Sequence, residues 1–170
     1  TGTEISDTAA MTFISLPICG GVVNDSNQSN AVGYCLKVAT DANGYWFTST
    51  PSIVVMDQLG YSISNSSNNT GDTYASTYTE NGTFGPVDGV FTRFRQDGNG
   101  AGQFDRWCQK LNDLGFGGRS TWERPTSDNL RALYSNNGNM WTARGWPADL
   151  TYWSATVVGS DYDSVSLRNG

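Results

Sequence analysis

Histidine is absent from this chain of 170 residues. Because histidine is the usual general base near neutral pH, its absence removes the Ser-His-Asp triad, the Cys-His pair and most zinc sites. The sequence also lacks a glycine-rich loop followed by Lys that could cradle a phosphate. Sixteen acidic residues leave a glycosidase-type pair of carboxylates open as an alternative. We nevertheless expect a protein that is not an enzyme and that carries no cofactor.

Basic residues are scarce: ten Lys and Arg stand against sixteen Asp and Glu, which gives a net charge of −6. The ten are scattered and make no basic stripe, which argues against nucleic acid as a partner. No stretch reaches the roughly 18 apolar residues that a membrane span needs, so we expect no membrane insertion by this chain. The chain begins at Thr1 without the charged and apolar regions of a signal peptide, which predicts a fragment of a larger protein.

Only three cysteines are present. Cys19 and Cys35 lie at two strand-like runs, residues 11–18 and 31–39, which a turn-rich linker joins. Two antiparallel strands would bring the Cα atoms of these cysteines to bridging distance. A disulfide between them is therefore predicted, and with it an oxidising compartment. Three reduced and buried thiols stay open as the alternative.

Residues 1–100 have the pattern of short strands and loops. Runs rich in β-branched and aromatic residues recur at 45–49, 53–56, 73–79 and 90–95, with turn residues between them. The pair Asn81 and Gly82 supplies the positive φ angles of a tight hairpin. The Asn- and Ser-rich stretch 62–71 has no periodicity and is expected to be a solvated loop. Residues 1–50 are either a β-rich extension of the same domain or the end of a preceding immunoglobulin-like domain.

The last seventy residues change to a helical period. Apolar residues spaced at i, i+3, i+4, i+7 and i+10 predict a helix with one buried face: Phe104, Trp107, Cys108, Leu111 and Leu114. The glycine that follows this run stands where a left-handed C-cap is expected. The cysteine of the run is therefore predicted to be an inward-facing, unreactive thiol.

A second helix is predicted to begin at the N-cap residue Thr126 and to break at Ser135. Leu130, Leu133 and Tyr134 would form its buried stripe. Alternating residues at 151–157 and 164–168, separated by a turn at 159–161, predict a closing β-hairpin. The chain is therefore expected to be an α+β protein.

An oxygen-rich stretch between Asp97 and Asp105 resembles a calcium loop at its first three positions only. The fifth and twelfth positions of an EF-hand loop need oxygen ligands, and here they hold Ala101 and Cys108. The sequence therefore favours a glycine-rich turn over an ion site, and no metal site is predicted.

Five segments of the second half follow one another in an order that resembles a known domain. They are Trp-Cys-Gln-Lys-Leu at 107–111, the stretch 122–134 with its Arg-Pro-Thr, Gly-Trp-Pro at 145–147, Tyr-Trp-Ser-Ala-Thr at 152–156 and Val-Ser-Leu-Arg-Asn-Gly at 165–170. The series resembles the C-type-lectin-like domain that ends intimin- and invasin-type adhesins of bacteria. The resemblance covers about residues 104–170 and, more weakly, 47–94.

The resemblance implies a C-type-lectin-like fold: two helices packed on small antiparallel sheets with long loops, with a core at about residues 86–170. Trp122, Trp146 and Trp153 would fill that core. The resemblance also implies an extracellular fragment of an outer-membrane-anchored protein at the bacterial cell surface, which binds a protein receptor on another cell. A calcium-independent glycan-binding module and a structural or self-association module stay as alternatives.

The chain departs from the family at three points. The segment 121–126 reads Thr-Trp-Glu-Arg-Pro-Thr where the family has Gly-Trp-Arg-Leu-Pro-Thr, and no cysteine follows Cys108. The Glu-Pro-Asn and Trp-Asn-Asp calcium motifs of sugar-binding animal lectins are absent as well. Calcium-dependent sugar coordination is therefore not expected.

The predicted binding surface is the loop region 135–149 together with the turn 159–163. It combines aromatic, arginine, amide and carboxylate side chains, and aromatic residues and arginine dominate the energy of protein interfaces. Its candidate residues are Asn136, Asn137, Asn139, Trp141, Arg144, Asp149, Asp161 and Tyr162.

Overall fold

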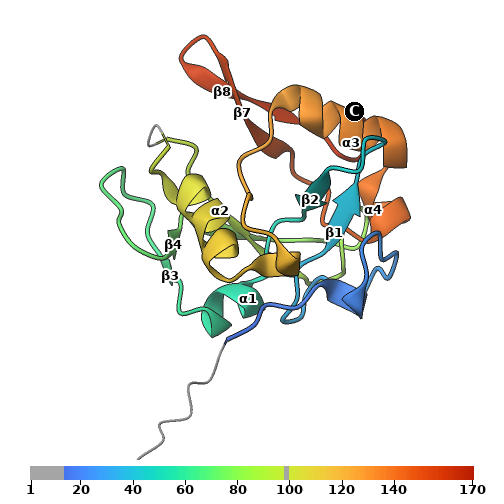
Figure 1. Ribbon diagram of the computed structural model, residues 1–170, viewed down its shortest axis with the longest axis horizontal. Helices are drawn as coiled ribbons and strands as arrows, with labels where there is room; N and C mark the ends of the chain where they lie inside the picture. Colours follow the sequence, from blue (N-terminus) through green and yellow to red (C-terminus); the bar gives the residue numbers. More distant parts are fainter. Residues whose placement is uncertain (1–13, 98–99) are drawn as a thin grey trace, which may run out of the picture.

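The computed structural model describes residues 14–97 and 100–170 and has a mixed α+β architecture (Figure 1). Within those residues it contains four α-helices and four two-stranded sheets. Helices α2 (Gln103–Asp113) and α3 (Ser127–Asn137) lie in different parts of the molecule, and residues 114–126 run between them (Figure 1). No helix of the described residues is both long and apolar enough to cross a bilayer.

The first sheet pairs β1 (Val38–Thr40) with β2 (Trp46–Thr48) in antiparallel register. The next run, predicted to be a strand at 53–56, is instead helix α1 (Ile53–Gln58). The hydroxyl of Ser52 caps this helix by accepting from the backbone N–H of Val55, at 3.3 Å. A capped start and the burial of two consecutive residues, Val55 and Met56, outweigh the β-propensity of the run.

The stretch 62–71 begins with a short strand and continues as a loop. Strand β3 (Ser62–Ile63) pairs with β4 (Thr73–Tyr74), and this sheet is parallel rather than antiparallel as expected. Strands β5 (Ser76–Thr79) and β6 (Val90–Arg93) are antiparallel. Their connection runs through residues 80–89, so Asn81 and Gly82 do not form the predicted tight hairpin. The buried side chain of Glu80 fills the connection and lies where a Cβ on Gly85 would stand.

Helix α2 confirms the first helical prediction, with Trp107, Cys108 and Leu111 buried and Gly115 left-handed at φ 59°. A 3-10 turn, η2 (Phe116–Gly118), follows it. Helix α3 begins as predicted behind Thr126, which forms a reciprocal capping box with the side chain of Asn129. It runs to Asn137, beyond the break expected at Ser135.

Helix α4 (Met140–Arg144) occupies a stretch predicted to be loop. The side chain of Asn139 accepts from two backbone N–H groups of this helix, and Met140 is fully buried. The closing hairpin is present as β7 (Tyr152–Val158) and β8 (Asp161–Val165), with the second strand starting three residues earlier than expected. The register shifts between Trp153 and Val157.

Two apolar cores hold these elements together, and the β1–β2 hairpin contributes to both. The first core groups residues of the chain up to η2: Leu16, Leu36, Val38, Val55, Met56, Tyr61, Tyr74, Trp107, Leu111 and Phe116. The second core joins the hairpin to α3, α4 and the C-terminal strand: Ala39, Phe47, Leu130, Leu133, Met140, Trp146, Val165 and Leu167. The described part of residues 1–50 is therefore packed against both α2 and α3.

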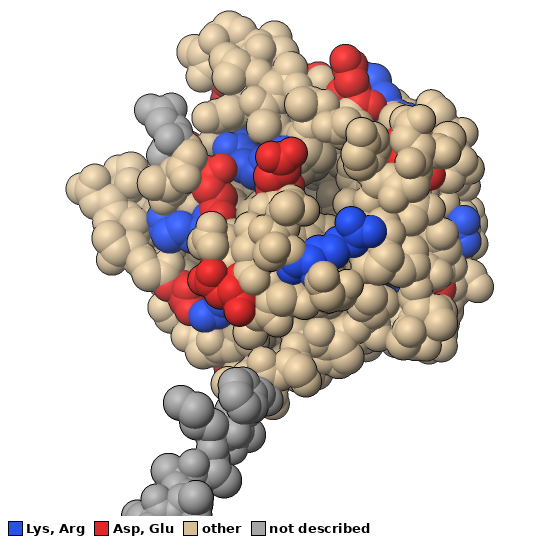
Figure 2. All heavy atoms as spheres, in the orientation of Figure 1, with Lys and Arg blue, Asp and Glu red and all other residues tan. Residues whose placement is uncertain are grey.

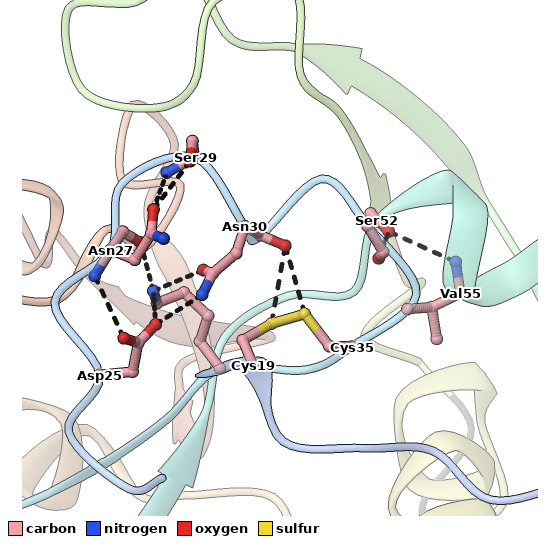
Figure 3. The surroundings of a disulfide bond; sticks show 10 residues. Cys19, Asp25, Asn27, Ser29, Asn30, Cys35, Ser52 and Val55 are labelled. Atoms are coloured by element: carbon pink, nitrogen blue, oxygen red, sulfur yellow. Dashed lines mark hydrogen bonds and ion pairs between the residues drawn. A yellow bond between two sulfur atoms is a disulfide. The ribbon is translucent and has the colours of Figure 1, made fainter. Parts of the chain in front are cut away.

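The predicted disulfide between Cys19 and Cys35 is present, with a Cα–Cα distance of 4.9 Å (Figure 3). The predicted pair of antiparallel strands is wrong. Cys19 starts the 3-10 turn η1 (Cys19–Gly21), and the preceding residue, Ile18, forms a parallel bridge to Leu36. The start of the first run, residues 11–13, lies outside the described residues.

Candidate functional site

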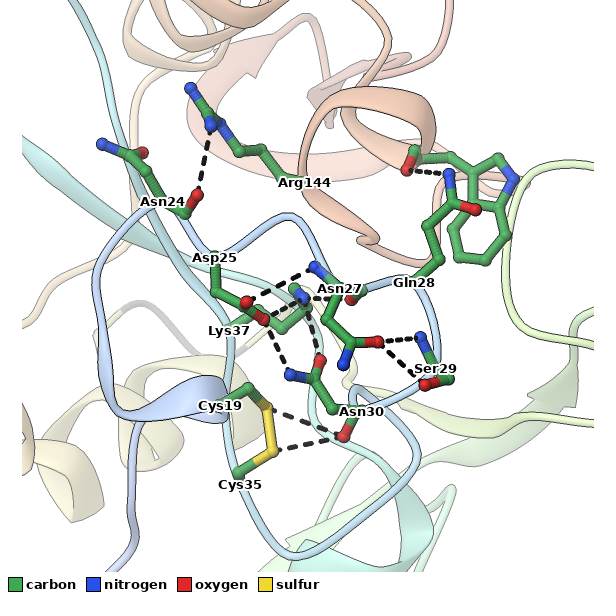
Figure 4. Close-up of polar contacts among 11 residues, drawn as sticks. Cys19, Asn24, Asp25, Asn27, Gln28, Ser29, Asn30, Cys35, Lys37 and Arg144 are labelled. Carbon is green, nitrogen blue, oxygen red and sulfur yellow. Dashed lines mark hydrogen bonds and ion pairs between the residues drawn. A yellow bond between two sulfur atoms is a disulfide. The ribbon is translucent and has the colours of Figure 1, made fainter.

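Part of the predicted binding surface lies against the N-terminal segment. The side-chain amides of Asn136 and Asn137 both donate to the carbonyl of Thr40, at 3.1 and 2.9 Å. Arg144 donates to Asn137 Oδ1 at 2.8 Å. It also donates to the carbonyl of Asn24 at 3.1 Å (Figure 4). These side chains join α3 and α4 to the first forty residues, while Asn139 caps α4.

The remaining candidates do not gather beside them. The half-buried Trp141 has its carbonyl bound by Gln28 Nε2 at 3.3 Å. Asp149 pairs with Arg168 at 3.0 Å. Asp161 and Tyr162 belong to the β7–β8 hairpin, whose tip lies at the opposite end of the molecule from α4 (Figure 1). The eight predicted residues therefore do not form one patch.

A cavity of about 510 Å³ lies where the two cores meet. Its walls come from β2, the end of β6, α2, the segment 119–125 and the start of β7. Ten aromatic side chains line it, among them Trp46, Phe94, Trp107, Trp122, Tyr152 and Trp153. This volume falls within the range of small-molecule sites in proteins, which are lined mostly by apolar and aromatic groups.

The sequence did not predict this cavity. Trp122 and Trp153 were expected to fill the core, but both are half-buried and line the cavity. Trp146 alone of the three is fully buried, as expected. The available signal was the position of the aromatic residues at the ends of polar loops, as in Tyr45-Trp46-Phe47 and Tyr152-Trp153.

Hydrogen bonds and ring stacking hold aromatic residues of the wall in place. The indole Nε1 of Trp122 donates to the carbonyl of Phe116 at 3.0 Å, and its backbone N–H donates to Asn112 Oδ1 at 2.6 Å. The ring of Trp107 stacks on Phe94, with centroids 5.8 Å apart. A wall fixed in this way loses little conformational entropy when it binds a ligand.

The charged groups in the cavity lining include more basic than acidic side chains. Figure 2 shows Lys and Arg side chains beside Asp and Glu over α2, and a hollow to the right of that helix. The cavity lining itself contains Arg93 and Arg119 and one carboxylate, Glu123. The guanidinium of Arg119 lies 4.0 Å from the ring centroid of Trp46, the distance of a cation–π contact.

Cys108 also lines the cavity, and it is a free thiol. Burial raises the pKa of this thiol to about 12, and the negative charge of Asp105 adds to the effect. Because the thiolate is the nucleophilic form, a thiol with this pKa is inert near neutral pH.

The stretch 97–105 is only partly described, because residues 98 and 99 lie outside the described residues. The Nε–H of Arg95 is shared between the two carboxylate oxygens of Asp97, each 3.0 Å from the nitrogen, and Asp105 lies 3.8 Å from Arg124. Over the ranges 14–97 and 100–170, no three His, Cys, Asp or Glu side chains are grouped so that they could hold a metal ion.

Comparisons with protein-family models, with curated proteins and with solved structures find no match to this chain. The geometry of the cavity is therefore the basis for a functional proposal.

Proposed function

We propose that this chain is an extracellular binding module of the C-type-lectin-like type from a bacterial surface adhesin, and that its aromatic cavity binds a carbohydrate without calcium. The observation that carries the proposal is the lining of a single cavity by ten aromatic side chains. A sugar ring has an apolar face that can stack on an aromatic ring, and the hydroxyls at its edge need only a few polar partners. Trp153 and the exposed Tyr45 are aromatic residues of the cavity wall that can stack on a sugar in this way.

Two further features support this assignment. The segments that resemble intimin- and invasin-type domains include most of α3 and parts of α2 and β7, and residues 145–147 directly after α4; these parts of the chain lie around the cavity and the second core. The Cys19–Cys35 disulfide is expected of a protein that works in an oxidising compartment outside the cytoplasm.

The chemistry of the lining supports binding rather than hydrolysis. Carboxylate catalysis of glycoside cleavage needs two acidic groups, roughly 5 to 10 Å apart, across the scissile bond. Among the described residues of the lining, Glu123 is the one acidic group.

A glycan array with purified protein tests the proposal, followed by titration of tryptophan fluorescence with each bound glycan. We expect binding that EDTA does not change and that Trp153→Ala and Tyr45→Ala each weaken by about tenfold or more. Trp141→Ala is the matched control, because Trp141 lies outside the lining. A blank array, or a binding loss caused by Trp141→Ala but not by Trp153→Ala, would reject the cavity as a sugar site.

A protein receptor on another cell is the second candidate, and the β7–β8 hairpin favours it. Val157 and Val158 on this hairpin are 63% and 59% exposed, beside the candidate residues Asp161 and Tyr162. Exposed apolar groups of this kind are typical of protein contact sites. Val157→Ser with Val158→Ser should then abolish cell attachment and leave glycan binding unchanged. Concentration-dependent assembly in analytical ultracentrifugation, lost in the same variant, would instead indicate self-association.

A further inference from the structure

We propose that the aromatic cavity selects an anionic carbohydrate, a sugar that bears a carboxylate or sulfate group, and that Arg93 and Arg119 bind the anionic group. This inference rests on the proposed function, in which the cavity binds a carbohydrate.

Most Lys and Arg side chains of the protein are paired with groups of the same chain. Of its ten Lys and Arg residues, six form ion pairs with Asp or Glu. Two more, Arg106 and Arg144, donate hydrogen bonds to carbonyl and amide oxygens. Arg93 and Arg119 are the two whose side chains have no hydrogen-bond or ion-pair partner among the described residues, and both line the cavity.

The position of Arg119 suits recognition of an anion. It follows the 3-10 turn η2 and is exposed, and its guanidinium lies over the ring of Trp46 at 4.0 Å. Stacking on an aromatic face fixes the plane of a guanidinium and leaves its N–H groups free to donate at the edge. A carboxylate or sulfate accepts two such N–H groups at once, which gives a strong and directional contact.

Arg93 adds a second donor group from a separate element. It is the last residue of β6, and it is also exposed. Two arginines against Glu123 give the lining a net charge of +1, from +2 and −1, within a protein whose net charge is −6. A locally positive site on an acidic molecule draws anionic ligands towards it and away from the rest of the surface.

Two amide side chains of the lining are committed to the protein. Gln96 donates to the carbonyl of Phe94 at 2.9 Å and accepts from Arg124 at 3.0 Å. Asn129 accepts from Thr126 in the capping box of α3. Hydroxyl groups such as those of Thr48, Thr121 and Thr151 remain as neutral partners for a sugar, and the two arginines are the cationic donors of the lining.

The experiment compares three probes by isothermal titration calorimetry: an oligosaccharide ending in a uronic acid, its counterpart ending in the neutral sugar, and a sulfated form of the neutral one. At low salt we expect at least one of the two anionic probes to bind about tenfold or more tightly than the neutral probe. That advantage should shrink as the salt concentration rises. The anionic probe that binds more tightly shows whether the cavity prefers a carboxylate or a sulfate.

Arg93→Gln and Arg119→Gln should each reduce the affinity advantage of the anionic probe over the neutral probe by about tenfold. Arg119→Lys keeps the charge without the planar fork and should recover part of the loss. Arg131→Gln is the matched control, because Arg131 is a surface arginine outside the lining. Both Gln variants replace exposed side chains, and circular dichroism checks that they are folded.

The outcomes separate this inference from the function on which it rests. Equal affinity for anionic and neutral probes, or arginine variants that leave the difference unchanged, would overturn the anionic preference and keep the sugar site. No binding of any probe together with a blank array would overturn both proposals.

Discussion

The ammonium of Lys37 lies 2.8 Å from a carboxylate oxygen of Asp25, and only 1% of the Lys37 side chain is exposed. The same nitrogen donates to the carbonyl of Asn27 at 2.5 Å and to Asn30 Oδ1 at 2.9 Å (Figure 4). Three acceptors thus satisfy the three N–H groups of a buried cation. The loop 24–30 is therefore folded around the ammonium group of Lys37, the residue that precedes β1.

Lys37→Met should lower the free energy of unfolding by about 3 kcal/mol, because it leaves the partly buried Asp25 without its counter-charge. Chemical denaturation at neutral pH measures the change. Lys110→Met is the matched control, since its pair with Asp72 is 26% and 41% exposed. That pair should contribute about 1 kcal/mol or less. Equal effects of the two substitutions would contradict this account of the loop.

Asp25 should make the protein sensitive to acid. Burial raises the pKa of this carboxyl, but hydrogen bonds from Lys37 and Asn30 outweigh burial and hold the pKa below its ordinary value of 3.8. A depressed pKa in the folded state gives a stabilisation that is complete above pH 3.8 and is lost as the pH falls through the folded value. Asp25→Asn should remove this acid sensitivity, as thermal unfolding between pH 2 and pH 7 would show.

Glu80 should have the opposite pH dependence. Its side chain is buried, Oε2 has no hydrogen-bond partner, and burial raises the pKa of the carboxyl. The contribution of Glu80 to stability is therefore fully present below its ordinary pKa and is lost as the pH rises through the folded value. Glu80→Gln should raise the melting temperature at pH 7 and change it little at pH 4. A Gln variant less stable than the parent at pH 7 would refute this.

The disulfide should contribute substantially to stability. It joins residues 16 positions apart. Closing a loop of this length stabilises a fold by about 3 kcal/mol in the chain-entropy model. Replacing Cys19 and Cys35 by Ser should lower the free energy of unfolding by about that amount, measured against the parent in denaturant. Cys108 should react with a thiol reagent only after unfolding, because it is buried.

Two tryptophans should separate stability from binding. Trp146→Ala should cost about 3–5 kcal/mol, because that side chain is fully buried in the second core. Trp153→Ala should cost less, since this residue is half-buried at the cavity wall, and it should reduce sugar binding. Calorimetric melting and fluorescence titration distinguish the two effects. Equal melting temperatures in the two variants would contradict the placement of Trp153 at the cavity.

The sequence predicted the two helices that are defined by residues close to one another in the chain. The apolar stripe of α2 and the capping residue Thr126 of α3 depend on neighbours within one or two helical turns, and both are where they were expected. Helix α1 differs from the predicted strand because its run of β-branched residues favours a strand, while the cap at Ser52 starts a helix. Helix α4 was missed because five residues are too few to show a helical period.

The cavity could not be derived from local patterns, because its walls come from segments up to about a hundred residues apart. Hydrophobicity marks Trp122, Trp146 and Trp153 alike, and only their tertiary positions separate the buried residue from the two at the cavity wall. The contacts of the polar candidates also depend on the tertiary structure. Residues such as Asn137 and Arg144 can bind a ligand or the backbone of the same chain, and the partner is known only once the fold brings residues 24–40 against them.

The β1–β2 hairpin serves as a common wall for the two cores, since Val38 and Trp46 face one while Ala39 and Phe47 face the other. Separating the hairpin from the C-terminal helices would therefore divide the second core. If the chain were divided between residues 119 and 125 to make a split-protein reporter, the C-terminal piece would lack the hairpin side chains of its core. The two pieces would therefore have to associate before the reporter could give a signal.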